Sequence, residues 1–373
     1  MSGIPERVRE LIRASAISQR DLAAEIGLDA TKLSKSLSQT RRFSSLDLAR
    51  LAERFDVTVD WLISGEEPAL AVAARSTGGS AQVAARQAAE LSQLRADLAW
   101  LGHPQRWLDF PSRSGGRRVD EGDRLARAAL AELAKAGRSP NEESLPDVVE
   151  VVFGLEVAVA ELGESFDGLA ASTDTARLMV VNTSPMPGRQ RFTMAHELAH
   201  LLLGDDQDVR LDADIYAPES RQDASEVRAN AFAASFLMPE PLLRTEIGDN
   251  VAVEQLAALA FRLRVTPLAL SYRLQTLRLV DAGVAAELSR ISESRAASLA
   301  GHQGEFAMRL QIANQTRPPG LLVRDAFAAY DAGKTTLRPY ARLIGVDPDE
   351  LCRQLEAAEA AGSGAEGHGS DSG

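Results

Sequence analysis

Two histidines four positions apart are the most chemically specific feature of the chain. The stretch RFTMAHELAHLLLG, residues 191–204, holds His196 and His200 with Glu197 between them, and the whole chain has only five histidines. On an α-helix, positions i and i+4 differ by about 40° in azimuth and about 6 Å in rise, so both imidazoles face one side and can bind one ion. Glu197 lies one position round the helix, where its carboxylate can take a proton from a metal-activated water. The pattern predicts a zinc site with a general base. The alternative is a core helix with two hydrogen-bonded histidines.

The third ligand must come from further along the chain. Metzincin enzymes place a histidine six residues after the second one, but that position is Asp206, and no histidine lies between His200 and His302. Carboxylates are plentiful from Asp205 onward. Glu226 is favoured among them because it begins a helical pattern, SEVRANAFAASFLMP, that can pack against the histidine helix. Its alternative role is a first-turn acid stabilised by the helix dipole.

Together the two motifs, RFTMAHELAHLLL and EVRANAFAASFLMP, followed by LALSYRLQTLRLV, resemble the ImmA/IrrE family of metallopeptidases over roughly residues 145–280. The resemblance implies a zincin-like domain with His196, His200 and Glu226 as metal ligands and Glu197 as the catalytic glutamate. It also implies cleavage of helix-turn-helix repressors. Zinc is the expected metal, and manganese also suits two histidines and a carboxylate.

For the elements that position these residues, the sequence predicts a mainly α fold with a small antiparallel β-sheet, which is an α+β class. Residues 145–182 contain three β-prone runs, VVEVVFGLEVAVAEL, FDGLAAS and ARLMVVN, which predict three strands. Helical patterns cover residues 83–101 and 121–136. The predicted order is a DNA-binding domain 1–66, a linker 67–82, a helical connector 83–140, a metallopeptidase domain 141–280, a helical region 281–358 and a disordered tail 359–373.

A protease also needs a group that stabilises the oxyanion. Tyr216, Tyr272 and His302 are candidates that the sequence does not rank.

Composition limits the function classes. The chain has 373 residues and a net charge of -12, which excludes a protein that coats nucleic acid along its length. Residues 1–65 carry ten Lys/Arg and nine Asp/Glu, a sum of +1, so any DNA contact must be local. A single cysteine, Cys352, excludes a disulfide framework and a cysteine-based zinc ribbon. The chain has no apolar run of membrane-spanning length and no signal-like start, so a cytoplasmic protein without membrane contact is expected.

The local DNA-binding candidate is SQRDLAAEIGLDATKLSKSLSQTRRFS. Ser18 and Asp29 are predicted N-caps of two short helices joined at Gly27. Residues 4–65 closely resemble the Cro and phage-repressor (XRE) class of helix-turn-helix domains. This resemblance implies a five-helix lambda-repressor-like domain whose second motif helix enters the major groove of an operator, usually as a homodimer. The predicted DNA-contacting residues are Gln19, Thr31, Lys32, Ser34, Lys35, Arg41 and Arg42. The alternative is a helical protein-interaction module.

These parts together predict a DNA-binding transcriptional regulator with a zinc-dependent endopeptidase that cleaves a helix-turn-helix repressor or an antitoxin. A second hypothesis is a non-proteolytic repressor or activator whose metal domain acts as a sensor or dimerisation module. A third is an anti-repressor that only binds its target. Loss of Glu197 separates the first hypothesis from the second, because a sensor needs the ligands and not the base.

Overall fold

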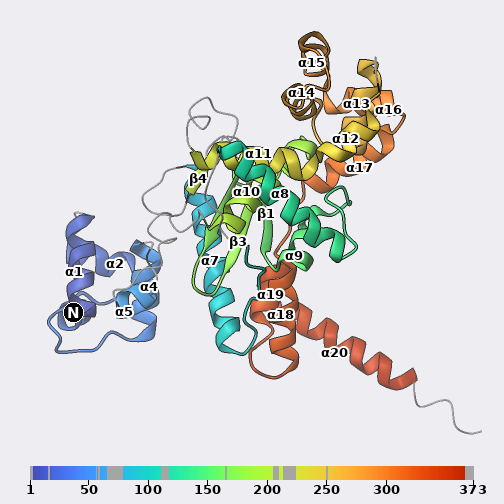
Figure 1. Cartoon of the computed structure of the whole chain (residues 1–373). Helices are drawn as coiled ribbons and strands as arrows, with labels where there is room; N and C mark the ends of the chain where they lie inside the picture. The colour runs from blue at the N-terminus through green and yellow to red at the C-terminus, as the bar shows by residue number, and fades with distance from the viewer. Residues whose placement is uncertain are drawn as a thin grey trace, which may run out of the picture. The chain divides into compact units, whose positions relative to one another are not determined.

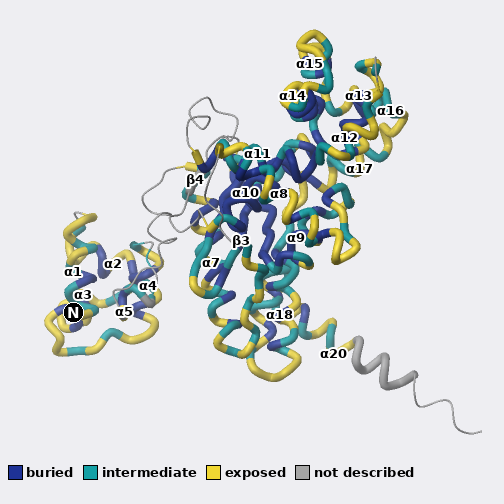
Figure 2. The backbone as a smooth tube through the Cα atoms, in the orientation of Figure 1, coloured by how far each residue is buried: buried dark blue, intermediate teal, exposed yellow. Residues whose placement is uncertain are grey.

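The computed structural model describes residues 3–15, 17–55, 57, 59–64, 79–110, 117–163, 166–204, 210–212, 224–248 and 251–365 (Figures 1 and 2). The chain divides into two compact units, Met1–Ala89 and Glu90–Gly373, each with its own internal contacts. Within the described ranges, none of the helices combines the length and the apolar character that crossing a lipid bilayer requires.

The first unit contains the helices α1 (Ile4–Ala14), α2 (Gln19–Glu25), α3 (Ala30–Leu37), α4 (Ser45–Phe55) and α5 (Val59–Ser64). The two predicted N-caps are confirmed. Ser18 Oγ accepts a hydrogen bond from the Asp21 amide at 3.1 Å, and the Asp29 carboxylate accepts from the amides of Thr31 and Lys32. Gly27 adopts a positive φ of 61° in the turn between α2 and α3. Their apolar faces, with Leu22, Leu33 and Leu51 fully buried, form a separate core.

The second unit is built around a mixed sheet with strand order β1-β3-β2-β4. The strands are β1 (Glu156–Ala160), β2 (Gly168–Ser172), β3 (Arg177–Asn182) and the short β4 (Arg210–Asp212). The expectation of an antiparallel sheet is correct for β2 and β3 and wrong for β1, which pairs parallel to β3. The β2–β3 hairpin places β3 beside β1, so β3 runs in the direction of β1. At the outer edge of β1, Val159 and Arg317 exchange two backbone hydrogen bonds of 2.8 Å.

The first predicted strand run is partly wrong, because its Val-rich half is the helix α9 (Leu145–Phe153). Ser144 caps its start, since the Ser144 hydroxyl accepts from the Asp147 amide, and Pro146 lies in its first turn. Gly154 ends it in the left-handed region at φ 70°. These start and stop signals outweigh the β propensity of the valines. Only the second half of the run, from residue 156, forms a strand.

The central helix α10 (Pro187–Leu203) carries the histidine motif and is buried along nearly its whole length. It packs against β2, β3 and α11 (Ala224–Leu237), and α8 (Arg118–Lys135) packs along α11 (Figure 1). The α8–α11 approach requires a glycine, because a Cβ at Gly122 would lie 2.4 Å from the carbonyl oxygen of Arg228. Figure 2 shows α10 within the dark blue, buried centre of this unit. The ligand-bearing helix is thus fixed from several sides.

A buried arginine connects two helices to the first strand of the sheet. Arg95 on α7 (Ser80–Trp100) has a fully buried side chain that contacts Glu156 on β1 and lies 2.7 Å from Asp325 on α18 (Gly320–Asp331). A third bond goes to the carbonyl oxygen of His103. Because α18 follows α11 in sequence by more than eighty residues, this cluster ties the C-terminal helices to the sheet.

The remaining helices are α12 (Glu240–Glu246), α13 (Val253–Arg262), α14 (Pro267–Thr276), α15 (Ala282–Leu288), α16 (Glu293–Ala300), α17 (Gln303–Ala313), α19 (Arg338–Ile344) and α20 (Pro348–Ala365). Thr266 caps the start of α14, since its hydroxyl accepts a hydrogen bond from the Ala269 amide at 3.0 Å. The helix α20 extends to Ala365, past position 359 where the predicted disordered tail starts.

Candidate metal centre

The three predicted ligands come together although α11 follows α10 after a long stretch of chain. His196 Nε2 lies 3.1 Å from His200 Nε2. The Glu226 carboxylate lies 3.1 Å from His196 Nε2 and 3.4 Å from His200 Nε2. All three residues are at most 4% exposed, and among the described residues they are the group of His, Cys, Asp and Glu side chains with metal-binding proximity. The four-residue spacing on α10 places the two histidines on one face, and the packing of α11 on α10 brings Glu226 to them.

The chemistry of these donors fits a divalent metal of the zinc type. Two imidazole nitrogens and one carboxylate are ligands that zinc prefers, and three protein ligands leave a coordination position open for chemistry. Two Nε2 atoms 3.1 Å apart face each other, so two neutral rings with both lone pairs inward would repel unless a cation or a proton lies between them. The residues present therefore suit a bound cation.

Asn230 contacts one of the predicted ligands, His196, and sequence reasoning assigned Asn230 no role. Its Oδ1 lies 3.2 Å from His196 Nδ1. When the Nδ1–H donates to this amide oxygen, the Nε2 lone pair is directed at the ligand cluster. Asn230 lies four residues after Glu226 on α11, so one helix face supplies both the ligand and the orienting amide. The four-residue spacing between Glu226 and Asn230 is the sequence signal that could have identified Asn230.

Glu197 is buried beside β2, with 1% of its surface exposed. The strand residue opposite is Gly168, where a Cβ would lie 3.2 Å from Glu197 Oε1 and 2.9 Å from Thr193 Cγ2. A side chain at this strand position would therefore displace the carboxylate. Sequence reasoning missed Gly168, and its signal was a glycine at the start of a β-prone run, which often marks a close approach.

Of the predicted oxyanion candidates, Tyr272 and His302 lie in the described part of the chain, and their contacts are with other elements than this cluster. Tyr216 lies outside the described residues. Tyr272 is 57% exposed on α14, a helix that packs on α13 and α15. His302 stacks on Phe261 at 5.6 Å between ring centroids and lies 3.5 Å from Glu305. These contacts give His302 a packing role.

The predicted DNA-contacting residues lie mostly on the surface of the first unit. Those exposed are Gln19, Thr31, Lys32, Ser34, Lys35 and Arg42. Lys32 and Lys35 are three positions apart on α3 and therefore share a face. The structure presents a short polar and basic helix face, on the side of α3 away from Leu33 and Leu37.

Arg41 differs from the rest of this set because it is half-buried and paired within the unit. Its Nη1 lies 2.7 Å from the Asp47 carboxylate and 2.8 Å from Ser36 Oγ. Burial opposes ionisation of Asp47, but hydrogen bonds from Ser44 and Arg41 hold its pKa below the ordinary value of 3.8. Arg41 thus joins the end of α3 to the start of α4.

Residues 153–275 match the family model described as IrrE N-terminal-like domain, Peptidase_M78. Two curated proteins named radiation response metalloprotease IrrE are similar. The chain is 42% identical to the Deinococcus radiodurans protein over 67 residues, 18% of this chain and 20% of that protein. It is 31% identical to the Deinococcus deserti protein over 120 residues, 32% of this chain and 42% of that protein. The chain thus spans less than half the length of these relatives. The matched range contains the whole ligand cluster, so the comparisons support a metallopeptidase domain in this part of the chain.

Proposed function

We propose that this protein is a DNA-binding transcriptional regulator whose central domain is a zinc-dependent endopeptidase. The observation that carries the peptidase is the convergence of His196, His200 and Glu226 next to a buried Glu197. Support for a metallopeptidase also comes from the match over residues 153–275.

His196, His200 and Glu226 would hold the metal. When bound, a zinc ion polarises a carbonyl and acidifies water, and manganese suits the same ligands. Glu197 is the general base that takes the proton of the attacking water and passes it to the leaving amine as the peptide bond breaks. Asn230 holds His196 in orientation, and Gly168 leaves space for the Glu197 carboxylate. The proposed substrate is a helix-turn-helix repressor or an antitoxin.

The proposed DNA interface is the exposed face of α3 with Gln19 and Arg42. A basic helix face of this kind contacts phosphates and base edges when it enters the major groove. A homodimer would place two such faces on a palindromic operator. Replacing Lys32 and Lys35 together with alanine should weaken binding to double-stranded DNA and reduce the salt dependence of that binding.

The test of the peptidase compares protein N-termini by mass spectrometry in cells that carry the wild-type chain or the Glu197→Gln variant, with and without DNA damage. This variant keeps all three ligands and removes the base. The matched control is Glu254→Gln, which changes an exposed glutamate on α13. New N-termini inside a helix-turn-helix protein that disappear only in Glu197→Gln support the proposal and identify the substrate. Identical N-termini, with unchanged zinc content and unchanged gene regulation, contradict it and favour a metal-dependent regulator without turnover.

A further inference from the structure

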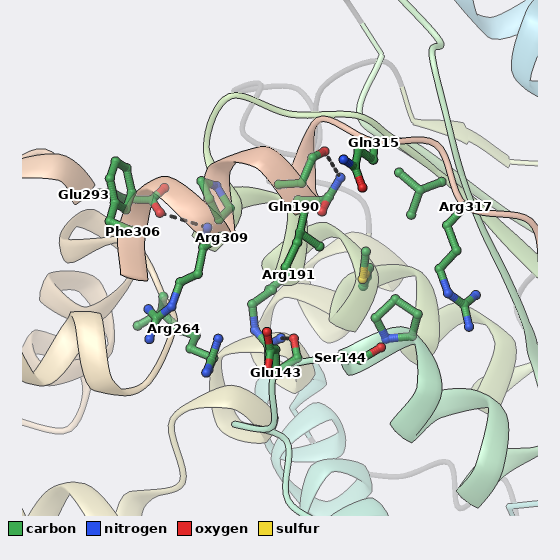
Figure 3. A pocket seen from close by; sticks show the side chains of 18 of the residues that line it. Glu143, Ser144, Gln190, Arg191, Arg264, Glu293, Phe306, Arg309, Gln315 and Arg317 are labelled. Atoms are coloured by element: carbon green, nitrogen blue, oxygen red, sulfur yellow. Dashed lines mark hydrogen bonds between the residues drawn. The ribbon is translucent and has the colours of Figure 1, made fainter. Parts of the chain in front are cut away.

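A cavity of about 400 Å³ lies beside the first half of α10, apart from the metal ligands (Figure 3). Its walls come from α10, α13, α16 and α17 and from the segments around residues 143–146 and 315–317. The volume is in the range of small-molecule pockets. Part of the wall is apolar, with Met194, Val265, Phe306 and Ile312. The proposed peptidase chemistry uses none of these residues.

Three arginines give this cavity its charge. Arg191 on α10, Arg264 after α13 and Arg309 on α17 all line it, and Figure 3 shows their side chains coming together from these three elements. Burial lowers the pKa of Arg191 to about 9. The nearby guanidinium groups of Arg264 and Arg309 contribute to this decrease. Three like charges in one partly apolar cavity repel each other and favour a bound anion.

Arg191 is the least compensated of the three. It is 7% exposed, and its guanidinium donates to the carbonyl oxygens of Pro140 and Glu143. Its buried Nε has no hydrogen-bond partner within the described part of the chain. Carbonyl groups satisfy part of the hydrogen bonding but supply no negative charge, and an uncompensated buried charge is costly.

The other two arginines share one carboxylate. Arg309 donates to Glu305 through Nε at 3.1 Å, and Arg264 lies 3.5 Å from the same carboxylate. Arg309 is also held by Phe261, since it donates to the Phe261 carbonyl at 2.8 Å and its guanidinium lies 3.9 Å from the ring centroid. These contacts fix the guanidinium groups in place before a ligand arrives, which lowers the entropic cost of binding.

Two carboxylates, Glu143 and Glu293, also line the cavity, and Glu143 partly compensates the charge of Arg264. Glu293 accepts a hydrogen bond from the Gly188 amide at 2.9 Å at the start of α10. Burial raises the pKa of Glu293, although the amides of Gly188 and Arg189 oppose the rise. One oxygen of Glu293 is therefore held by the helix start, and Arg309 also attracts this carboxylate. Arg317, the fourth arginine in the wall, is paired with Asp147 and Glu150.

We propose that this cavity binds a small organic anion, a carboxylate or a phosphate monoester with an apolar body. Arg191, Arg264 and Arg309 hold the anionic group, and the apolar wall around Met194 and Phe306 accepts the body. Arg191 precedes His196 by five residues, a rise of about 7.5 Å along one helix. The ligand would thus contact the helix that carries two of the proposed metal ligands.

The test measures binding of phenyl phosphate and benzoate to the purified full-length protein by titration calorimetry and by the shift in thermal unfolding midpoint. Inorganic phosphate lacks the apolar body, and phenol lacks the charge. We expect at least one aromatic anion to bind more tightly than both of these probes. The stronger of the two aromatic anions identifies phosphate or carboxylate as the preferred group.

Two variants locate the site. Arg264→Gln should weaken binding of the aromatic anion by at least about tenfold, because hydrogen bonds to charged groups are strong. Arg262→Gln is the matched control, since Arg262 lies two positions earlier, is 60% exposed and pairs with Glu246; it should leave binding unchanged. The proposal is overturned if neither aromatic anion binds, if phenol binds as tightly, or if both variants have the same effect. Because the readout is binding, it is independent of the proposed peptidase activity.

Discussion

At the scale of single residues, Gly168 illustrates how a site depends on a side chain that is absent. A Cβ at this position would approach both Thr193 and Glu197. We expect Gly168→Ala to lower the rate of the proposed peptide cleavage by at least about tenfold, since small displacements of a catalytic group have effects of this size. Zinc content, measured by mass spectrometry, should not change. Gly304→Ala, at a position with nothing within 4 Å, is the control. Full activity in Gly168→Ala would show that Glu197 tolerates the displacement.

Asn230 supports a second prediction at this scale. Replacing it with leucine removes the partner of His196 Nδ1, and loss of such a partner weakens metal binding by roughly 10- to 100-fold. Competition with a zinc chelator measures the change. Asn230→Asp keeps an acceptor and should restore most of the affinity. Equal zinc affinity in the leucine variant and the wild type would mean that other contacts orient His196.

The sequence predicts the residues of the candidate metal centre better than their surroundings. His196, Glu197 and His200 follow from helical spacing, and Glu226 follows from its place at the start of a helix. The close approach of Gly168 to Glu197 depends on how β2 lies against α10. The arginine cavity forms because side chains of α10 and α17 line one space. Such contacts depend on tertiary packing, which local patterns do not encode.

At the scale of elements, the start of a helix was predictable where the capping side chain lies within a few residues of the amide that it binds. Ser18, Asp29 and Thr266 each accept a hydrogen bond from an amide two or three residues later, so short-range sequence is enough. Strand pairing is not local. The parallel alignment of β1 with β3 arises because a hairpin intervenes, and residues 148–153 are helical despite their valines.

The Arg41–Asp47 pair joins two elements of the first unit and distinguishes two adjacent arginines. We expect Arg41→Ala to destabilise the contact between α3 and α4 by about 1.5 kcal/mol. Amide hydrogen exchange of peptides from residues 30–55, measured in the full-length protein, should become faster. Arg42→Ala, at an exposed position, should leave exchange unchanged and weaken the proposed binding to double-stranded DNA. Identical exchange in both variants would contradict the structural role of Arg41.

The same pair predicts a pH dependence. The pKa of Asp47 is below its ordinary value of 3.8 in the folded protein, so its contribution to stability is fully present above that pH. The contribution is lost as the pH falls through the folded pKa. The stability difference between the wild type and Asp47→Asn should therefore shrink below about pH 3.8. Urea titrations followed by NMR signals of residues 19–55 measure it. A constant difference at all pH values would argue against an ionised Asp47 as the source.

At the scale of the whole molecule, Arg95 connects α7, β1 and α18 within the second unit. Arg95→Met leaves Glu156 and Asp325 buried without this partner, and breaking a buried ion pair costs about 3–5 kcal/mol. Chemical denaturation of the full-length protein measures the loss. Arg324→Met is the control, because Arg324 contacts the same Asp325 from a side chain that is 67% exposed; its effect should be at most about 1 kcal/mol. Equal losses in both variants would contradict the central role of Arg95.

The pairing of Val159 with Arg317 has a consequence for synthesis of the chain on the ribosome. The backbone partner at the outer edge of β1 emerges more than a hundred residues after β1 itself, and Asp325 follows later still. Until then, the amide and the carbonyl of Val159 at this edge lack their partner, and unpaired groups at a sheet edge are prone to wrong pairing. A fragment that ends at residue 275, the limit of the matched family model, would keep that edge exposed permanently. Expression of the matched region 153–275 alone should therefore favour aggregation, and a soluble fragment should extend beyond residue 325.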